Sequence, residues 1–263
     1  MRKVALLFLL GLALAQGRLE AGLYGAPGGV TPALEAAFAL GEGEVYLKGQ
    51  VGRGALGYLG SLSLGPLGYL AYGAQGEVGE GGLGGALFLE GGAGPLAAEG
   101  RLGYRPQGAF PLFPEAGFFG RLALRYRATP REVWGVEAAG NTPSRPATFG
   151  LQPGLYGVWR LEGSYAFRQE ATYTLGLGVS SGPYALLGFK GEVGEEGEVL
   201  DLLLRLGGVN RLEAGLYLGE ASLHLTLSYP WAGSLGVWLG DLGLEAGHQG
   251  SPYAWVRYTW RWP

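Results

Sequence analysis

The chain has 263 residues and a formal net charge of −3, and only 16% of its residues are charged, against about 25% in a typical soluble domain. This balance, with a pI near 5.5, excludes a nucleic-acid-binding protein that depends on a basic surface. The absence of cysteine excludes disulfides, thiolate metal sites and anchoring through an acylated cysteine.

Glycine accounts for 53 of the 263 residues, far above the usual ~7%. The strict three-residue repeat of collagen is absent, and a hydrophobic content of 48% argues against disorder. Beyond residue 15, no apolar run approaches the ~20 residues of a membrane-spanning helix. A closed barrel reconciles these features, because each strand can turn an apolar face to lipid and a polar face to the lumen.

The first fifteen residues have the three parts of a secretory signal peptide. Residues 1–3 include Arg2 and Lys3, residues 4–14 are apolar, and Ala13 and Ala15 form a small-x-small cleavage site. The apolar run is too short to span a bilayer. We therefore predict a signal peptide at residues 1–15 and a membrane β-barrel at residues 16–263, with a mature chain that starts at Gln16.

Alternation of polar and apolar side chains marks short segments that we expect to be β-strands. In residues 44–51, for example, Val45 and Leu47 alternate with Tyr46 and Lys48. A period of two is what a sheet with one dry and one wet face requires. In chain order, the clearest such segments are residues 44–51, 98–105, 121–127, 159–165, 200–206, 222–229 and 253–262.

Clusters of Gly, Pro, Glu and Ser separate these segments at intervals of about a dozen residues. Residues 106–117 and 140–153 are rich in proline and long enough to form loops. The spacing predicts an all-β fold, a single antiparallel transmembrane β-barrel of about 16 strands, with about 14–18 tolerated. We expect an even number, since the two ends of the sheet must pair antiparallel to close it.

The last segment carries the most specific pattern in the chain. Tyr258, Trp260 and Trp262 fall on one side of a strand, and Arg257 and Arg261 fall on the other. This segment resembles the closing strand of bacterial outer-membrane β-barrel (porin-like) proteins, which ends in an aromatic residue; here Pro263 follows, so the aromatic residue is penultimate.

The resemblance implies several properties of the whole chain. It implies location in the cell outer membrane, periplasmic termini, contact with outer-membrane lipid and insertion by the barrel-assembly machinery, with Tyr258, Trp260 and Trp262 as the assembly signal. It also implies aromatic girdles where the barrel crosses the membrane surfaces. The girdle candidates are Tyr104, Tyr126, Trp134, Trp159, Tyr229, Trp231, Trp255 and Trp260.

Charged residues on the polar strand faces are the predicted pore lining. Five arginines share the polar faces of residues 98–105 and 121–127, with Glu99 as the one carboxylate among them, so neighbouring strands would form a basic wall that favours small anions. The alternative is that these arginines pair with lumen carboxylates such as Glu162 or Glu213. The predicted pore-lining residues are Glu99, Arg101, Arg105, Arg121, Arg125, Arg127, Arg160, Glu162 and Arg205.

Motifs that suggest catalysis have simpler explanations. The sequence G-x-S-x-G at residues 178–182 leads into another alternating segment rather than the helix that a nucleophile elbow requires. His224 and Ser222 share a polar face, but in the reverse of the order used by outer-membrane lipases. The chain has two histidines and no ligand cluster beside them. We predict no enzyme activity, no catalytic residue, no metal and no cofactor.

The sequence favours an outer-membrane β-barrel that acts as a passive pore for small solutes, with a weak preference for anions. One alternative is a non-conducting structural barrel of the envelope, whose partner would be a surface layer or the cell wall. Another is a secreted soluble β-sandwich, in which the apolar faces would be buried between two sheets.

Overall fold

The computed structural model describes residues 16–108, 112, 116–140, 157–168, 171–179, 182–193, 197–248 and 250–262, and residues 157–168 are described as backbone only. No helix in this part of the chain is long and apolar enough to cross a membrane. One 3-10 turn, η1, covers Gly65–Leu67. The strands are β1 Gly17–Ala26, β2 Gly29–Leu40, β3 Gly43–Gln50, β4 Arg53–Ser63, β5 Tyr69–Gly79, β6 Gly82–Ala93, β7 Leu96–Arg105, β8 Gly117–Thr129, β9 Glu132–Gly140, β10 Gly157–Arg168, β11 Ala171–Val179, β12 Pro183–Glu192, β13 Val199–Leu206, β14 Asn210–Leu218, β15 Ala221–Tyr229, β16 Ala232–Leu239, β17 Leu242–His248 and β18 Pro252–Trp262.

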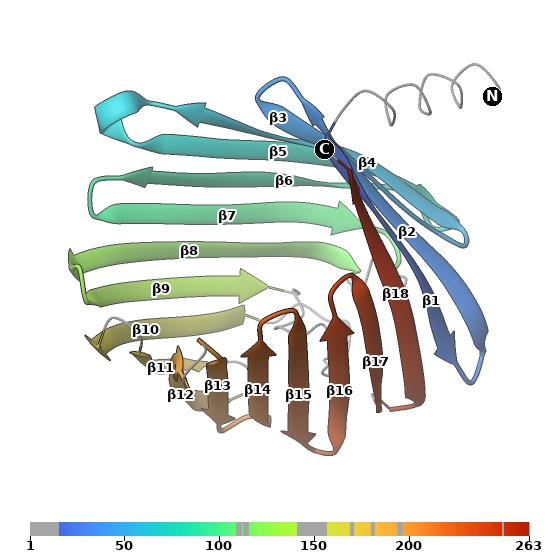
Figure 1. The fold of residues 1–263 in the computed structure, drawn as a ribbon. Helices are drawn as coiled ribbons and strands as arrows, with labels where there is room; N and C mark the ends of the chain where they lie inside the picture. The colour runs from blue at the N-terminus through green and yellow to red at the C-terminus, as the bar shows by residue number, and fades with distance from the viewer. Residues whose placement is uncertain are drawn as a thin grey trace.

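Each strand pairs antiparallel with the next strand in the chain, and β18 pairs with β1. The closing pairs run from Gly17 opposite Trp262 to Gly25 opposite Ala254. Figure 1 shows the strands following one another in chain order, with the first strand in blue beside the last in red. The all-β prediction of a single antiparallel barrel is confirmed, and the β-sandwich alternative is wrong because one sheet closes on itself.

The described strands form an 18-stranded sheet, at the upper end of the expected range. The central estimate was too low because several connections are only two residues long and interrupt the alternation only briefly. Pro130 and Arg131 join β8 to β9, and Pro230 and Trp231 join β15 to β16. The loops expected at residues 106–117 and 140–153 lie largely outside the described residues. The strands leave room for them, since β7 ends at Arg105 and β8 begins at Gly117, and β9 ends at Gly140 and β10 begins at Gly157.

The two ends of the barrel differ. Gly17 and Trp262 lie together at one end, because β1 and β18 are antiparallel neighbours. Following the strands in order places both long connections, 106–116 and 141–156, at the opposite end. We call these the terminal end and the loop end.

Alternation gives the barrel an apolar outside. Directly opposed residues in neighbouring strands point to the same side of a sheet, so the face of each strand follows from the register. Leu102, Leu122 and Leu175 lie on the outer face and are more than half exposed. Among strands with described side chains, Glu132 is the one Asp, Glu, Lys or Arg on that face, and it accepts a hydrogen bond from Trp134 Nε1 at 2.8 Å.

Glycines inside the strands have a definite packing role. A Cβ built on Gly57 would overlap the ring of Tyr46, and one built on Gly103 would overlap the ring of Phe119. Each ring therefore lies across the sheet where the neighbouring strand has no side chain. This arrangement accounts for part of the high glycine content, since flat rings on a curved wall need bare backbone beneath them.

Candidate functional site

Charges line the inside of the barrel in nearly balanced numbers. Register and alternation put them on the face opposite the outer leucines. The basic residues on the inner face of the described strands are Arg18, Lys48, Arg53, Arg101, Arg105, Arg121, Arg125, Arg127, Lys190, Arg205, Arg211, Arg257 and Arg261. The acidic residues on that face are Glu20, Glu35, Glu44, Glu77, Glu90, Glu99, Glu137, Glu192, Asp201, Glu213 and Glu245.

The predicted basic wall exists, but carboxylates divide it. Arg101 lies directly opposite Arg121 across β7 and β8. Arg121 Nη1 donates to Glu99 Oε1 at 3.1 Å and its Nη2 donates to Glu137 Oε2 at 2.9 Å. Arg125 Nη2 lies 3.9 Å from Glu99 Oε2. Glu137 was missed because the sequence shows neither the neighbour of β8 nor the register of that pair.

Arg105 is on the inner face of the barrel, but its side chain is buried and does not line the lumen. Its Nε donates to Glu77 Oε2 at 2.6 Å and its Nη2 to Glu77 Oε1 at 2.5 Å, and both side chains are 1% exposed. Gln75 Nε2 also donates to Glu77, and Tyr46 Oη donates to Gln75. One expectation is corrected here: Arg105 does not line the pore but is buried in an ion pair with Glu77 of β5.

Interior arginines stack on interior rings at separate places on the wall. Arg101 Cζ lies 5.3 Å from the centre of the Phe88 ring and 5.0 Å from that of Phe119. Arg205 Cζ lies 4.0 Å from the centre of the Tyr184 ring. Stacking holds a guanidinium by its face and leaves its N–H edges to make hydrogen bonds.

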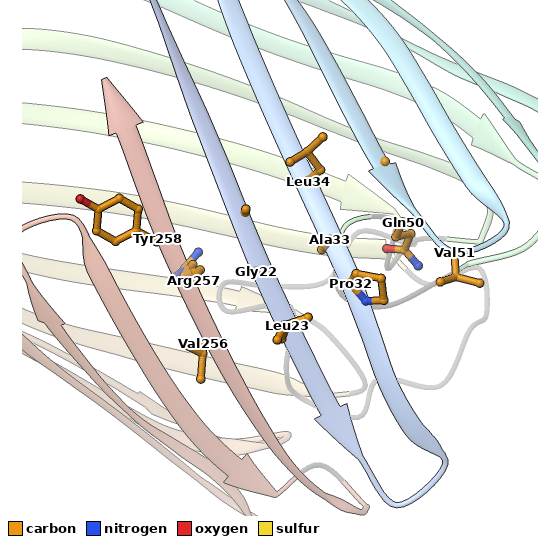
Figure 2. Close-up of a pocket in the computed structure, with 12 residues that line it drawn as sticks. Gly22, Leu23, Pro32, Ala33, Leu34, Gln50, Val51, Val256, Arg257 and Tyr258 are labelled. Carbon is orange, nitrogen blue, oxygen red and sulfur yellow. The ribbon is translucent and has the colours of Figure 1, made fainter. Parts of the chain in front are cut away.

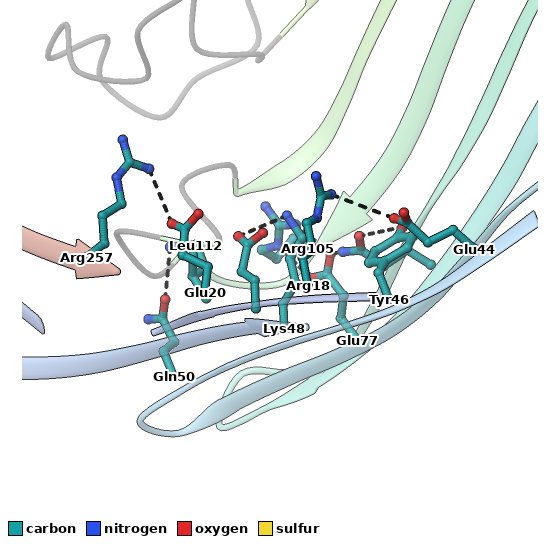
Figure 3. Close-up of polar contacts among 12 residues, drawn as sticks. Arg18, Glu20, Glu44, Tyr46, Lys48, Gln50, Glu77, Arg105, Leu112 and Arg257 are labelled. Atoms are coloured by element: carbon teal, nitrogen blue, oxygen red, sulfur yellow. Dashed lines mark hydrogen bonds and ion pairs between the residues drawn. The ribbon is translucent and has the colours of Figure 1, made fainter. Parts of the chain in front are cut away.

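Leu112, between β7 and β8, contacts the inner face of the barrel at the loop end. The backbone N–H of Leu112 donates to Gln50 Oε1 at 3.0 Å, and Gln50 lies on the inner face of β3. Figure 3 shows Leu112 and Gln50 among other interior polar side chains, including Lys48, whose amine lies 3.2 Å from the Glu35 carboxylate. Leu112 therefore lies on the lumen side of the wall.

A second interior region, on β14 to β18, is aromatic. The Tyr217 and His224 rings lie 5.2 Å apart, and the His224 and Trp238 rings lie 4.7 Å apart. Arg257 Cζ then lies 5.2 Å from the Trp238 ring centre and 4.6 Å from that of Trp255. The sequence alone does not reveal that these residues meet, because the five side chains come from four separate strands.

His224 was expected on a polar lumen face, and the structure places it there. Its Nε2 is 3.2 Å from Ser222 Oγ. Because the pair faces the interior, it cannot approach a lipid ester outside the barrel. Within the described residues, no group of three or more His, Asp or Glu side chains could hold a metal ion.

The girdle candidates fall into three sets. Tyr126, Trp134 and Trp260 lie on the outer face toward the terminal end. At the loop end, Tyr104 and Tyr229 lie on the outer face and Trp231 is 82% exposed in a turn. The remaining candidates are Trp255 and Trp159.

The prediction that Trp255 belongs to an aromatic girdle is wrong, since its ring lies on the inner face and stacks on Arg257. The side chains of Trp159, Arg160 and Glu162 lie outside the described part of the structure. The backbone register places Arg160 opposite Glu137 and Glu162 opposite Gly135.

The proposed assembly-signal residues share one face of β18. Tyr258 and Trp260 are in edge contact, with ring centres 4.5 Å apart, and Trp262 lies 6.1 Å from the Phe38 ring of β2. The predicted alternation of the closing strand is therefore present, and the role of these residues in assembly stays a prediction.

Two grooves interrupt the outer face. One, of about 620 Å³, crosses β18, β1, β2 and β3 and is bordered by Leu23, Leu34, Val256 and Tyr258 (Figure 2). The other, of about 880 Å³, crosses β6 to β9 where Gly100 and Gly120 leave gaps beside large apolar side chains. These outer-face residues are apolar, so the grooves suit contact with hydrocarbon.

Neither a family model nor a curated protein sequence matches the chain. A triple variant of the Rhodopseudomonas blastica porin aligns with 93% of this chain and 99% of the porin, at 9% identity and a TM-score of 0.51. A multiply substituted variant of that porin aligns with 94% of this chain and 99% of its own, at 9% identity and a TM-score of 0.51.

A structure described as "Asymmetric conductivity of engineered proteins" aligns with 94% of this chain and 99% of its own, at 10% identity and a TM-score of 0.52. The likeness extends over nearly all of both chains although few residues are shared. The chain thus has a porin-like β-barrel fold.

Proposed function

We propose that this chain is an outer-membrane β-barrel that forms a passive pore for small solutes. The main support for the proposal is that charged side chains lie on the inner face of the barrel and apolar side chains on the outer face. In the strands whose side chains are described, the outer face has one charged residue, Glu132 at the start of β9, and the inner face has all the others. Such a surface is unfavourable in water and matches hydrocarbon outside and water inside.

The size of the barrel supports a pore. Barrels of about 16–18 strands leave room for an aqueous channel, whereas about 8 strands are filled by their own side chains. A channel also accounts for the polar interior, since charged side chains from most of the described strands point into it. Export would depend on the signal peptide at residues 1–15, and the terminal end would face the periplasm.

Selectivity is proposed to be weak and in favour of anions. Basic side chains slightly outnumber acidic ones on the described inner face. Arg125 contributes a half-exposed guanidinium, and Arg127 is exposed near the terminal end. Ion pairs such as Arg121 with Glu99 and Glu137 cancel much of the field of the wall.

Single-channel recording in planar bilayers tests the pore. We expect discrete conductance steps in KCl and, across a KCl gradient, a reversal potential with the sign of a weak anion preference. Replacing Arg125 and Arg127 with Gln should move that potential toward cation preference. A wild-type pore that prefers cations would overturn the selectivity, and a sealed barrel would overturn the pore.

The second candidate is a non-conducting structural barrel that contacts a surface layer or the cell wall. It is favoured by the contact of Leu112 with Gln50, which places Leu112 on the lumen side of the wall. The buried Arg105–Glu77 pair also fills part of that side. Deleting residues 109–114 distinguishes the two: a plugged barrel should conduct only after the deletion, whereas an open pore conducts before it and more strongly after it.

A further inference from the structure

The interior contains a cluster of rings and opposite charges around Arg257, which we call the Arg257 cluster. It consists of Trp238, Trp255, Arg257, Glu20 and Glu245, contributed by β16, β18, β1 and β17. Its position on the inner face at the closure of the barrel is fixed by the pairing of β18 with both β17 and β1.

Glycines make the geometry of this cluster possible. The residues directly opposite Arg257 are Gly243 on β17 and Gly22 on β1. A Cβ on Gly243 would lie 2.8 Å from Trp238 Nε1, and one on Gly22 would lie 2.5 Å from Trp255 Nε1. The two indoles thus occupy the space on either side of Arg257 and hold its guanidinium by stacking.

The stacked guanidinium retains hydrogen-bonding capacity. Arg257 Nη1 contacts Glu20 Oε1 at 3.4 Å, its one hydrogen-bond partner in the described part of the chain. A guanidinium has five N–H donors, and the side chains of Arg257 and Glu20 are 25% and 30% exposed. Figure 3 shows the two groups pointing toward each other from β18 and β1.

A second carboxylate lies on the other side of Arg257. Glu245 is opposite Trp255 in the β17–β18 pair, one diagonal step from Arg257, and it accepts a hydrogen bond from Tyr253 Oη at 2.7 Å. The cluster therefore presents one fixed positive group between two negative groups, beside aromatic rings. A simple anion would meet repulsion from both carboxylates, and a simple cation would meet repulsion from Arg257.

We propose that the Arg257 cluster binds zwitterionic solutes with a flat apolar side chain, the class to which aromatic amino acids and short peptides containing them belong. The α-carboxylate would pair with Arg257, the ammonium group with Glu20 or Glu245, and the ring would lie against Trp238 and the neighbouring His224 and Tyr217. This inference rests on the proposed pore, because the solute must reach the lumen.

Four small probes separate the contributions of the ammonium group, the carboxylate and the aromatic ring to binding. Phenylalanine carries all three features, N-acetylphenylalanine lacks the ammonium group, phenylalanine methyl ester lacks the carboxylate, and glycine lacks the ring. We expect phenylalanine to interrupt the ion current at concentrations about tenfold lower than each of the others, since each charged contact contributes about one order of magnitude in affinity. Maltose serves as a neutral polyhydroxylated probe.

Two variants on one strand provide the matched comparison. R257Q should abolish the advantage of phenylalanine over its methyl ester. R261Q removes a cation from the same face of β18, one that pairs with Asp241 and does not stack on the two indoles, and should leave that advantage unchanged. E20Q should reduce the advantage of phenylalanine over the N-acetyl compound.

Isothermal titration calorimetry of the barrel in detergent measures phenylalanine binding without conductance, and so tests the binding site independently of the pore. Binding of phenylalanine without any conductance would overturn the pore and retain the site. Conductance with equal effects of phenylalanine and glycine, or of phenylalanine and N-acetylphenylalanine, would overturn the site and retain the pore. Stronger binding of maltose than of phenylalanine would also overturn it, because the fixed charges would then not select the solute.

Discussion

Arg105 and Glu77 form a doubly hydrogen-bonded ion pair inside the barrel, with donor–acceptor distances of 2.6 and 2.5 Å across 28 residues of sequence. β7 supplies the guanidinium and β5 the carboxylate, and β6 lies between them. Gly84 on β6, directly opposite Glu77, has no side chain to separate the two groups.

Replacing Glu77 with Gln should destabilise the barrel strongly, because it leaves the buried Arg105 guanidinium without its counter-charge. We expect a loss of about 3–5 kcal/mol in the free energy of unfolding, measured from urea unfolding in lipid vesicles. Glu99→Gln is the control, since the Glu99 carboxylate is 36% exposed and water can compensate its loss. The double variant E77L/R105M should recover only part of the stability, because Arg53, whose side chain is 5% exposed and lies 3.9 Å from Glu77 Oε2, also loses that carboxylate. Equal losses in E77Q and E99Q would contradict the burial of the pair.

The two faces of β13 should respond oppositely to a new charge. Leu204 lies opposite Leu187 and Leu212, on the outer face. L204R should cost about 2–4 kcal/mol if the site lies near the bilayer midplane. The neighbouring L203R places its charge inside, opposite Glu213, and should cost much less. Unfolding in vesicles compares the variants, and similar losses would mean that the inside–outside assignment of this strand is wrong.

A methyl group at Gly57 should be costly for a specific reason, since it overlaps the Tyr46 ring. We expect G57A to destabilise by about 1–3 kcal/mol through overpacking. G76A is the matched control, because a Cβ there has no neighbour within 4 Å. In a Tyr46→Leu background the cost of G57A should shrink, and an unchanged cost in that double-mutant cycle would show that the ring is not the cause.

Deleting residues 261–263 should impair assembly more than export. The deletion removes the closing pairs of Trp262 with Gly17 and Arg261 with Arg18, whereas export is predicted to depend on the proposed signal peptide at residues 1–15. We expect the truncated chain to reach the periplasm and to remain protease-sensitive there. Trp262→Phe keeps an aromatic residue and should assemble normally. Normal outer-membrane levels of protease-resistant truncated chain would rule out this role for the terminus.

Cleavage after Ala15 should leave a mature chain that begins at Gln16. β1 starts at Gly17 and pairs with β18 to close the barrel, so removal of residues 1–15 leaves the closing strand intact. N-terminal sequencing of protein purified from membranes checks this, and an intact Met1 would contradict it.

The sequence alone determined the fold class and the two faces of the strands. Alternation is a local property with a period of two residues, so Leu204 and Arg205 could be assigned to opposite faces without knowledge of their neighbours. The aromatic face of the last strand could be read in the same way from Tyr258, Trp260 and Trp262. The number of strands was harder to predict from the sequence, because a two-residue turn such as Pro130–Arg131 interrupts the alternation of polar and apolar residues only slightly.

Only the tertiary structure decided which charges meet. From the sequence, Arg105 is a pore-lining cation, and only the register of β5, β6 and β7 shows that it meets Glu77. The same holds for Arg257, whose neighbours Gly22 and Gly243 lie far away in the sequence. A one-residue change in strand register would move every side chain of a strand to the opposite face. Electrostatic partners therefore depend on long-range pairing that no local pattern encodes.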